Sequence, residues 1–394
     1  MRKVAVVGAS LSGLRAAESA LRSGYEGEIV LFGDEVHLPY NRPPLSKEAL
    51  EHSAELSSVL LRSSFKDRIS YKLETKIQNA NLATGEIVTD AGESYRFDAI
   101  VAASGLRSRG LKIPKPTNGV FTLRRFDDMV AIRTALATSK KIAIIGAGFV
   151  GCELASTFTR LGHQVTIIAP EPCPMLRPLG KKLGASLLEH HAKAGVEFAL
   201  NRLPIEIAGA DCPVSVVCDD GTVVESDVVI EAVGSTANTE WLEGNDLDLS
   251  DGVVCNEFLQ TGDGVPLFVV GDIAKFPNLL FDQVPRRVEH WGIAVDSGRY
   301  AGKSLAKVLQ GELLEEPFRP LPAFWSDQFD LRIQSFGMPG LTSDESSIEV
   351  LEGDLNSEVS VGYYRGDTLV GVVMIGMASS QGKYRNLVLD SLTN

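Results

Sequence analysis

The feature that most constrains this sequence is a glycine pattern that occurs twice. In residues 4–24 an apolar run precedes Gly8-x-Ser10-x-x-Gly13 and an amphipathic segment. In residues 141–162 a similar run precedes Gly146-x-Gly148-x-x-Gly151. Each copy predicts a buried strand, a tight turn and a helix, and a second strand-like run follows each copy at residues 28–32 and 164–168.

A turn of this kind suits a dinucleotide. The glycines allow the backbone to approach a pyrophosphate, and the helix N-terminus supplies free N–H groups and a positive dipole. In the first copy Ser10 takes the place of the second glycine, and serine is small enough to be tolerated there. Two copies at domain-sized separation predict two doubly wound domains rather than a solenoid, whose period is ~20 to 50 residues.

Acidic residues after the second strand indicate which nucleotide each copy binds. Asp34 and Glu35 follow the first copy at the distance expected for a ribose-binding carboxylate. In the second copy Ala169 ends the strand and Glu171 is the nearest acid. Because no Lys or Arg follows until Arg177, a 2′-phosphate has no evident partner, and NADH is favoured over NADPH.

Further strand-like runs complete the domain plan. Residues 95–105 and 228–235 are expected to end the two copies, and residues 265–274 to resume the first domain after the second. A Pro-punctuated segment near residue 317 then leads into alternating strand-like sequence. The predicted fold is α/β, with two doubly wound (Rossmann-type) nucleotide-binding domains, one inserted in the other, plus a small C-terminal α+β domain.

Composition and charge exclude several classes of partner. The 394 residues are enough for two to three domains, and a net charge of −13 repels phosphate backbones and anionic lipid surfaces. The apolar run at residues 369–378 is too short to span a bilayer. We therefore expect no nucleic acid, no membrane association and a cytoplasmic protein. The five cysteines, never spaced C-x-x-C, predict neither disulfides nor a metal site.

Five longer motifs resemble one flavoprotein family. The segments HLPYNRPPLSK (37–47), GAGFVGCELA (146–155), VVGDIA (269–274), RVEHW (287–291) and FWSDQFD (324–330) are similar to those of FAD-dependent NAD(P)H:ferredoxin and rubredoxin reductases. This family includes reductase components of oxygenase and cytochrome P450 systems and relatives of apoptosis-inducing factor. Motif order and spacing match over essentially the whole chain.

The resemblance implies FAD in the first copy and the nicotinamide nucleotide in the second. It implies an FAD-binding domain in two segments, 1–109 and 238–318, an NAD(P)-binding domain at 110–237 and an interface domain at 319–394. The residues expected to bind the two nucleotides, from the glycine patterns, the acids after them and the family motifs together, are Gly8, Ser10, Gly13, Asp34, Glu35, Arg42, Lys47, Ile77, Gly105, Arg124, Gly146, Gly148, Gly151, Glu153, Glu171, Gly234, Gly271, Asp272, Glu289 and Trp291.

Some of these residues carry more specific expectations from the family. Arg42 and Lys47 would contact the flavin nucleotide, and Asp272 would bond its ribityl chain. Ile77 would meet the adenine and Arg124 would lie near the FAD. Trp291, with Glu289, would lie at the isoalloxazine edge.

The resemblance also places two candidate catalytic residues, Lys47 and Glu153, on facing sides of the flavin ring. Lys47 would stabilise the reduced, anionic flavin. Glu153 would position Lys47 and accept the carboxamide N–H of the nicotinamide. We expect Glu153 to lie in the first turn of its helix, where the positive dipole end favours a carboxylate.

The expected reaction passes electrons from NADH through FAD to a separate ferredoxin, which would supply an oxygenase or P450. Hydride delivers two electrons at once, and a flavin can release them singly to an iron–sulfur protein. None of the five cysteines has the close spacing that a cluster needs, so the acceptor must be another protein.

Two alternatives remain open. A disulfide reductase or peroxide-reducing oxidase would need a redox cysteine where residues 41–44 stand. A nucleotide-sensing or interaction flavoprotein of the apoptosis-inducing-factor type would oxidise NADH slowly.

A basic stripe offers a candidate docking surface for the ferredoxin. Arg299, Lys303 and Lys307 recur every four residues in the helix-like segment 293–309, so they are expected to share one face.

Overall fold

The computed structural model describes residues 2–342, 344–355 and 357–393. The chain divides into two compact units, each assembled from three stretches of sequence. Unit 1 comprises residues 1–41, 60–107 and 237–323, and unit 2 comprises residues 42–59, 108–236 and 324–394. We describe each unit by itself.

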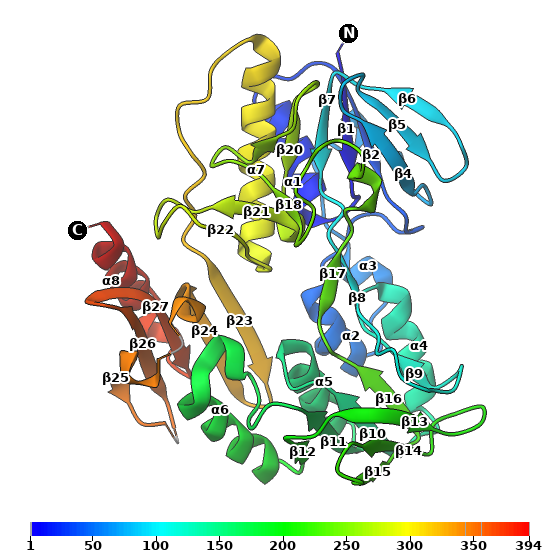
Figure 1. Ribbon diagram of the computed structural model, residues 1–394, viewed down its shortest axis with the longest axis vertical. Helices are drawn as coiled ribbons and strands as arrows, with labels where there is room; N and C mark the ends of the chain where they lie inside the picture. Colours follow the sequence, from blue (N-terminus) through cyan, green and yellow to red (C-terminus); the bar gives the residue numbers. More distant parts are fainter. Residues whose placement is uncertain (1, 343, 356, 394) are drawn as a thin grey trace. The chain divides into compact units, whose positions relative to one another are not determined.

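Unit 1 is built on a sheet with the strand order β19-β20-β7-β1-β2-β3 (Figure 1). Its strands are parallel except β19, which runs antiparallel to β20. In chain order the bounds are β1 Lys3–Val7, β2 Glu28–Phe32, β3 Ile69–Lys72, β7 Ala99–Ala102, β19 Gln260–Thr261 and β20 Leu267–Val269. The central strands are almost fully buried, as their near-continuous apolar sequence predicts.

Two long helices of unit 1 pack against each other, α1 (Leu11–Arg22) and α7 (Trp291–Gln310) (Figure 1). Glycines make this close approach feasible. A Cβ atom on Gly298 would lie 2.4 Å from the Ser12 carbonyl oxygen, and one on Gly302 would lie 2.2 Å from that of Ala16. The second segment of unit 1 is therefore fixed directly onto the first nucleotide-type helix.

Unit 1 also carries two small sheets. One is antiparallel, with the strands β4 Ile77–Asn81, β5 Glu86–Thr89 and β6 Ser94–Arg96. The other contains β18 Val253–Val254, β21 Ala274–Pro277 and β22 Pro285–Arg287. The chain passes from one unit to the other within β8 (Leu106–Ser108) and β17 (Ser235–Ala237).

Unit 2 contains a second parallel sheet, with the order β12-β11-β10-β16-β9. Its strands in chain order are β9 Val120–Phe121, β10 Lys141–Ile145, β11 Gln164–Ala169, β12 Glu197–Leu200 and β16 Val228–Glu231. The helices of unit 2 ahead of its C-terminal part are α2 Glu48–Glu51, α3 Leu56–Val59, α4 Phe126–Leu136, α5 Phe149–Arg160 and α6 Leu176–Lys193. A three-stranded antiparallel sheet adds β13 Pro204–Ala208, β14 Ser215–Cys218 and β15 Val223–Glu225.

The C-terminal part of unit 2 is a five-stranded sheet with the order β23-β24-β27-β26-β25, followed by a helix (orange to red in Figure 1). The bounds are β23 Ala323–Gln328, β24 Leu331–Gly337, β25 Ile348–Gly353, β26 Val359–Arg365, β27 Thr368–Ile375 and α8 Gln381–Thr393. The Tyr363 hydroxyl donates to the Leu179 carbonyl of α6 at 2.7 Å, which ties this sheet to the helix.

The α/β fold class predicted from the sequence is confirmed, including both strand–turn–helix copies and the C-terminal α+β part. The predicted domain boundaries stay a prediction. The two units group the chain differently, because residues 42–59 and 324–394 belong with the second parallel sheet. In the described residues no helix is both long enough and apolar enough to cross a membrane.

Candidate active site

The turn in unit 1 that follows β1 depends on glycine. Gly8 has φ +124°, and a Cβ there would lie 2.0 Å from the Ala103 carbonyl oxygen. A Cβ on Gly13 would lie 2.1 Å from the Gly8 carbonyl oxygen, so the helix begins directly over the turn. Ser10 is the extended N-cap of α1, and its side chain makes no capping hydrogen bond. The first N–H groups of α1 are thus left to a ligand, which fits a pyrophosphate.

The second copy in unit 2 repeats this geometry. Gly146 has φ +112°, and a Cβ there would lie 2.3 Å from the Ala232 carbonyl oxygen. Gly148 is the N-cap of α5, and a Cβ on it would meet nothing within 4 Å. This open space at a helix N-terminus is where a pyrophosphate must approach the backbone, so the residues present fit a dinucleotide.

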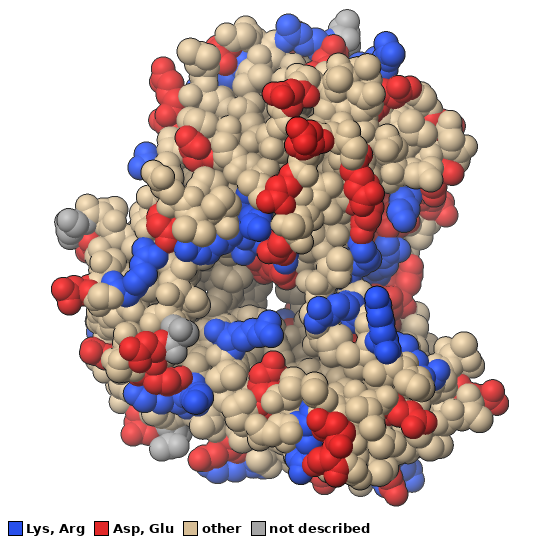
Figure 2. Space-filling model, in the orientation of Figure 1, with Lys and Arg blue, Asp and Glu red and all other residues tan. Residues whose placement is uncertain are grey.

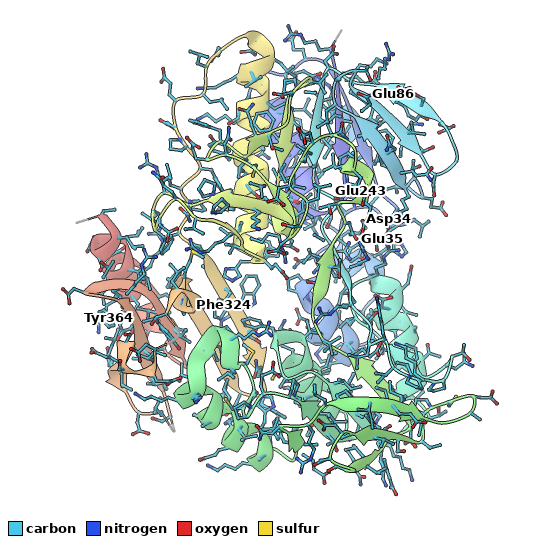
Figure 3. All side chains as sticks on the ribbon, viewed as in Figure 1. Asp34, Glu35, Glu86, Glu243, Phe324 and Tyr364 are labelled. Carbon is cyan, nitrogen blue, oxygen red and sulfur yellow. The ribbon has the colours of Figure 1, made fainter. Side chains whose placement is uncertain are left out.

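Other predicted nucleotide residues of unit 1 are Asp34, Glu35 and Gly105, which follow the parallel strands β2 and β7, and Ile77, which lies in a separate small sheet. Asp34 and Glu35 follow β2 and are labelled in Figure 3. Glu35 accepts a hydrogen bond from the Tyr40 hydroxyl at 2.5 Å, while Asp34 is exposed. Gly105, with φ +63°, has open space at its Cβ position. Ile77 is buried at the start of β4.

The segment from β20 to α7 contains the remaining predicted residues of unit 1. Gly271 has φ +69°, and its N–H donates to the Ser297 hydroxyl at 3.0 Å. The Arg287 guanidinium donates to the Asp272 carbonyl at 3.0 Å and to Glu289 at 2.7 Å. Trp291 begins α7 and donates its indole N–H to Asn41 at 2.8 Å. The roles predicted for these residues toward the flavin stay predictions.

In unit 2 the pair predicted from the resemblance forms a buried ion pair. The Lys47 ammonium lies 2.7 Å from Oε2 of Glu153, and both residues are less than a tenth exposed. The Ser46 hydroxyl donates to the same oxygen at 2.6 Å. The predicted approach of Lys47 to Glu153 is confirmed.

A rigid local turn places Ser46 and Lys47. Pro43 and Pro44 occupy the first positions of a short 3₁₀ helix, Pro43–Ser46, whose φ angles their rings fix. Lys47 ends that turn and donates a second hydrogen bond to the Pro43 carbonyl at 3.1 Å. Thr157 of α5 donates to the Ser46 carbonyl at 2.8 Å, so the turn is held against the same helix that carries Glu153.

The expected place of Glu153 on its helix is wrong. The helix α5 begins at Phe149, before Gly151, so Glu153 lies in the second turn and no acidic residue lies in the first. The dipole effect falls off within the first turn, so it does not account for the buried carboxylate. Instead, three donors hold its charge: Ser46, Lys47 and a hydroxyl from the C-terminal sheet.

That third donor is Ser326 of β23, which donates to Oε1 of Glu153 at 2.7 Å. The chain of hydrogen bonds continues behind it, because the Gln328 amide nitrogen donates to the Ser326 hydroxyl at 3.1 Å. The Gln328 amide oxygen lies 2.8 Å from Nε2 of His191 on α6. Ser326, Gln328 and His191 are fully buried. Five side chains from four segments thus form a single polar chain that ends at Lys47.

Sequence reasoning missed Ser46, Ser326, Gln328 and His191 as members of this site. Ser46, Ser326 and Gln328 stand inside the family motifs at residues 37–47 and 324–330, which was a usable signal. His191 stands in a helix without a motif, and only the packing of α6 against β23 brings it close.

Two more contacts join β23 and the residue that follows it, Phe329, to α5. Phe324, labelled on β23 in Figure 3, packs edge-on against Phe149 with ring centroids 5.0 Å apart. The Phe329 N–H donates to the Ser156 hydroxyl at 2.6 Å. The first residue of α5 and Ser156 in its third turn are therefore both held by the C-terminal part of unit 2.

The remaining predicted residues of unit 2 lie around these elements. Arg42 donates to the Arg124 carbonyl at 2.7 Å. Glu171 follows β11 and is partly buried. Gly234 has φ +99° and accepts the Arg109 N–H at 3.0 Å. No sequence-predicted role of these residues toward a nucleotide is tested by these contacts.

Comparison with known proteins gives the family. The model of the pyridine nucleotide-disulphide oxidoreductase family matches residues 2–298, and the model of a reductase C-terminal domain matches residues 323–392. The chain belongs to the pyridine nucleotide-disulphide oxidoreductase family. This membership confirms the predicted resemblance and, with it, FAD and NADH as cofactors of this oxidoreductase.

Individual relatives cover nearly the whole chain. Putidaredoxin reductase CamA of Pseudomonas putida is 28% identical over an alignment of 402 positions, and the alignment covers 99% of this chain and 92% of that protein. A ferredoxin reductase structure from Rhodopseudomonas palustris is 28% identical with a TM-score of 0.92, covering 99% of this chain and 95% of that one. The covalent putidaredoxin reductase–putidaredoxin complex is 27% identical with a TM-score of 0.90, covering 99% and 93%.

The buried histidine of this oxidoreductase predicts a pH-dependent stability. Burial lowers the pKa of His191 to about 4, opposed by its hydrogen bond to Gln328. Unfolded, this imidazole takes up its proton near pH 6.5, so the folded state loses stability as the pH falls from there toward 4. Between pH 7 and pH 5 we expect His191 to account for a loss of about 2 kcal/mol in the free energy of unfolding.

The variant His191→Gln cannot take up that proton. Urea unfolding at pH 7 and pH 5 should show a smaller pH-dependent loss for the variant than for the wild-type protein. The polar and titratable groups that face His191 are Gln328 and His190, and His190 lies 2.9 Å from Asp330. An unchanged difference between the two pH values in the variant would contradict the assignment.

Proposed function

We propose that this protein takes hydride from NADH onto FAD and passes the electrons singly to a separate ferredoxin that supplies an oxygenase or a cytochrome P450. The relatives of near-full length are a putidaredoxin reductase and a ferredoxin reductase, and one solved relative is joined to putidaredoxin itself. The enzyme class predicted from the sequence is confirmed by these relatives.

The observation that carries the proposal is that no cysteine of this chain forms a disulfide and that no cysteine stands at residues 41–44, where a disulfide reductase would need one. All five cysteines are free, and Cys152, the neighbour of Glu153, is fully buried. Burial and the adjacent Glu153 raise the pKa of the Cys152 thiol, so it is not a thiolate nucleophile. Electrons therefore do not leave the flavin through a disulfide in this chain, and an external acceptor is required.

The two glycine turns bind different nucleotides in this proposal. We assign FAD to the Gly8 turn and the Gly271-Asp272 segment of unit 1, and NADH to the Gly146 turn of unit 2. When bound, FAD accepts the two electrons of a hydride and releases them one at a time. Glu153 accepts the carboxamide N–H of the nicotinamide, and Lys47 holds that carboxylate in place.

Charges near the end of β11 support NADH over NADPH. Arg202 lies at this end of the strand, because its backbone N–H donates to the Ala169 carbonyl at 3.1 Å. Its guanidinium already donates to Asp220 at 2.7 Å and to Thr222 at 2.9 Å. A 2′-phosphate would have to displace these partners, whereas a ribose hydroxyl needs only an acceptor such as Glu171.

We also place the protein in the cytoplasm. All five cysteines are free, and reduced cysteines are typical of a compartment that keeps thiols reduced.

The defining assay is NADH-dependent reduction of cytochrome c with and without a [2Fe–2S] ferredoxin. The FAD-loaded protein should reduce cytochrome c at least tenfold faster when ferredoxin is present, because the flavin delivers electrons to the iron–sulfur protein first. Ferricyanide, a small acceptor, serves as the control for active flavin. Equal cytochrome c rates with and without ferredoxin would contradict the proposal and favour a slow NADH oxidase or sensor.

The basic stripe on α7 is the proposed docking surface for this ferredoxin. Arg299 and Lys303 are exposed, and Lys307 is partly buried. Acidic side chains are spread over the surface of both units in the view of Figure 2, in line with the net charge of −13. A local group of cations is therefore needed to attract an acidic partner.

Charge reversal tests this surface. The double variant Arg299→Glu, Lys303→Glu should raise the ferredoxin KM several-fold at low salt, and less at high salt because counterions screen the attraction. The matched double variant Lys181→Glu, Lys193→Glu reverses two cations of unit 2 and should leave that KM near the wild-type value. Ferricyanide reduction should not change in either. An equal loss with ferricyanide would show damage to the flavin site instead.

A further inference from the structure

The hydrogen bonds behind Glu153 all point in one direction. Because the Gln328 amide nitrogen donates to Ser326, the Gln328 oxygen faces His191 and must accept. Nε2 of His191 therefore carries the proton, and Nδ1, which is buried, has no hydrogen-bond partner. The Ser326 hydroxyl in turn donates its hydrogen bond to Glu153. Every donor in the chain is aimed at the carboxylate.

Counting acceptor positions shows what this leaves at Glu153. A carboxylate accepts about four hydrogen bonds, two on each oxygen. Oε2 receives both the Lys47 ammonium and the Ser46 hydroxyl. Oε1 receives the Ser326 hydroxyl. One acceptor position, on Oε1, is left for a ligand, and Ser326 decides on which side of that oxygen it lies.

We propose that Ser326, Gln328 and His191 are positioning residues for hydride transfer, acting through Glu153. They fix the carboxylate so that the remaining acceptor position of Oε1 receives the carboxamide N–H of the nicotinamide. This inference rests on the proposed function, in which Glu153 binds that amide. It gives the first strand of the C-terminal domain a part in NADH oxidation, in addition to the ferredoxin interface predicted for that domain.

A purely structural role would make the same contacts, since buried polar atoms are normally paired. The two roles differ in what a broken chain does. If the chain only satisfies buried groups, breaking it lowers stability and leaves the chemistry of the folded protein unchanged. If it orients Glu153, breaking it slows hydride transfer in protein that is still folded and loaded with FAD.

Ser326→Ala is the first test, with Ser335→Ala as its matched control. Both serines are buried in neighbouring strands of one sheet, but the Ser335 hydroxyl has no hydrogen-bond partner. In stopped-flow reduction by NADH, Ser326→Ala should lower the limiting rate about tenfold and the affinity for NADH less. Ser335→Ala should keep the wild-type rate. A wild-type limiting rate in Ser326→Ala would overturn the proposal.

A binding measurement tests the same point without turnover. Calorimetry on the FAD-loaded protein compares NAD⁺ with its 3-acetylpyridine analogue, which lacks the carboxamide N–H. The wild-type protein should bind NAD⁺ more tightly than the analogue. The ratio of the two affinities should fall at least threefold in Ser326→Ala and should not change in Ser335→Ala. An undiminished preference in Ser326→Ala would show that Ser326 does not orient the acceptor.

Gln328→Glu reverses the chain without changing its shape. An ionised carboxylate at residue 328 accepts from both His191 and Ser326, so the Ser326 proton turns away from Glu153. At pH 8 the limiting rate of reduction should be about tenfold below wild type. It should recover toward pH 6, as the buried carboxyl group takes up a proton and donates to Ser326 again. An equal loss of the limiting rate at both pH values, or no loss at either, would contradict the proposed role of this hydrogen-bond chain.

The outcomes separate this inference from the proposed function. If NADH reduces the wild-type flavin but ferredoxin is not reduced, the proposed function fails while the comparison of Ser326→Ala with Ser335→Ala still decides the inference. If ferredoxin is reduced and Ser326→Ala behaves like wild type, only the inference fails.

Discussion

The buried carboxylate of Glu153 is the group on which the arrangement of unit 2 depends. An ionised carboxylate removed from water is costly unless donors surround it, and losing one partner of such a pair typically costs about 3–5 kcal/mol. Here the donors come from the segment before α2 and from β23, so two separate stretches of sequence must meet at the helix α5. This requirement explains why residues 42–59 and 324–394 group with the second parallel sheet.

The same arrangement links fold to chemistry. The glycine turns bring the backbone close enough to bind a pyrophosphate. They do not recognise or position the nicotinamide ring, which is the reacting end of the nucleotide. Positioning that ring needs a hydrogen-bond acceptor whose orientation is fixed. Glu153 is held by Ser46 and Lys47 on one oxygen and by Ser326 on the other. In the proposed function, a carboxylate held on both oxygens needs little reorganisation to accept the nicotinamide amide, and this preorganisation favours hydride transfer.

Local patterns made most of the fold predictable. The strand–turn–helix copies follow from apolar runs and from glycines whose Cβ atoms would collide with the backbone, and these are properties of a few adjacent residues. The Lys47–Glu153 contact joins residues far apart in sequence, and only the family motifs indicated it. Helix boundaries were less predictable. Because α5 starts at Phe149, Glu153 falls one turn later than expected.

The part of the site that sequence could not supply is the partner chain behind Glu153. Gln328 and His191 meet because α6 packs against β23, and nothing in the pattern around His191 distinguishes it from the adjacent His190. Its burial and its single hydrogen bond appear only once the tertiary structure is known.

The most direct test of the account is the rate of flavin reduction by NADH in Glu153→Gln, which keeps the side-chain shape and removes the charge. Glu231→Gln is the control, because Glu231 is also buried and lies 2.9 Å from Lys115 in the same unit. We predict that Glu153→Gln retains its FAD and is reduced at least tenfold more slowly than wild type, whereas Glu231→Gln is reduced at the wild-type rate. A wild-type reduction rate and NADH affinity in Glu153→Gln would contradict the central claim that this carboxylate orients the nicotinamide.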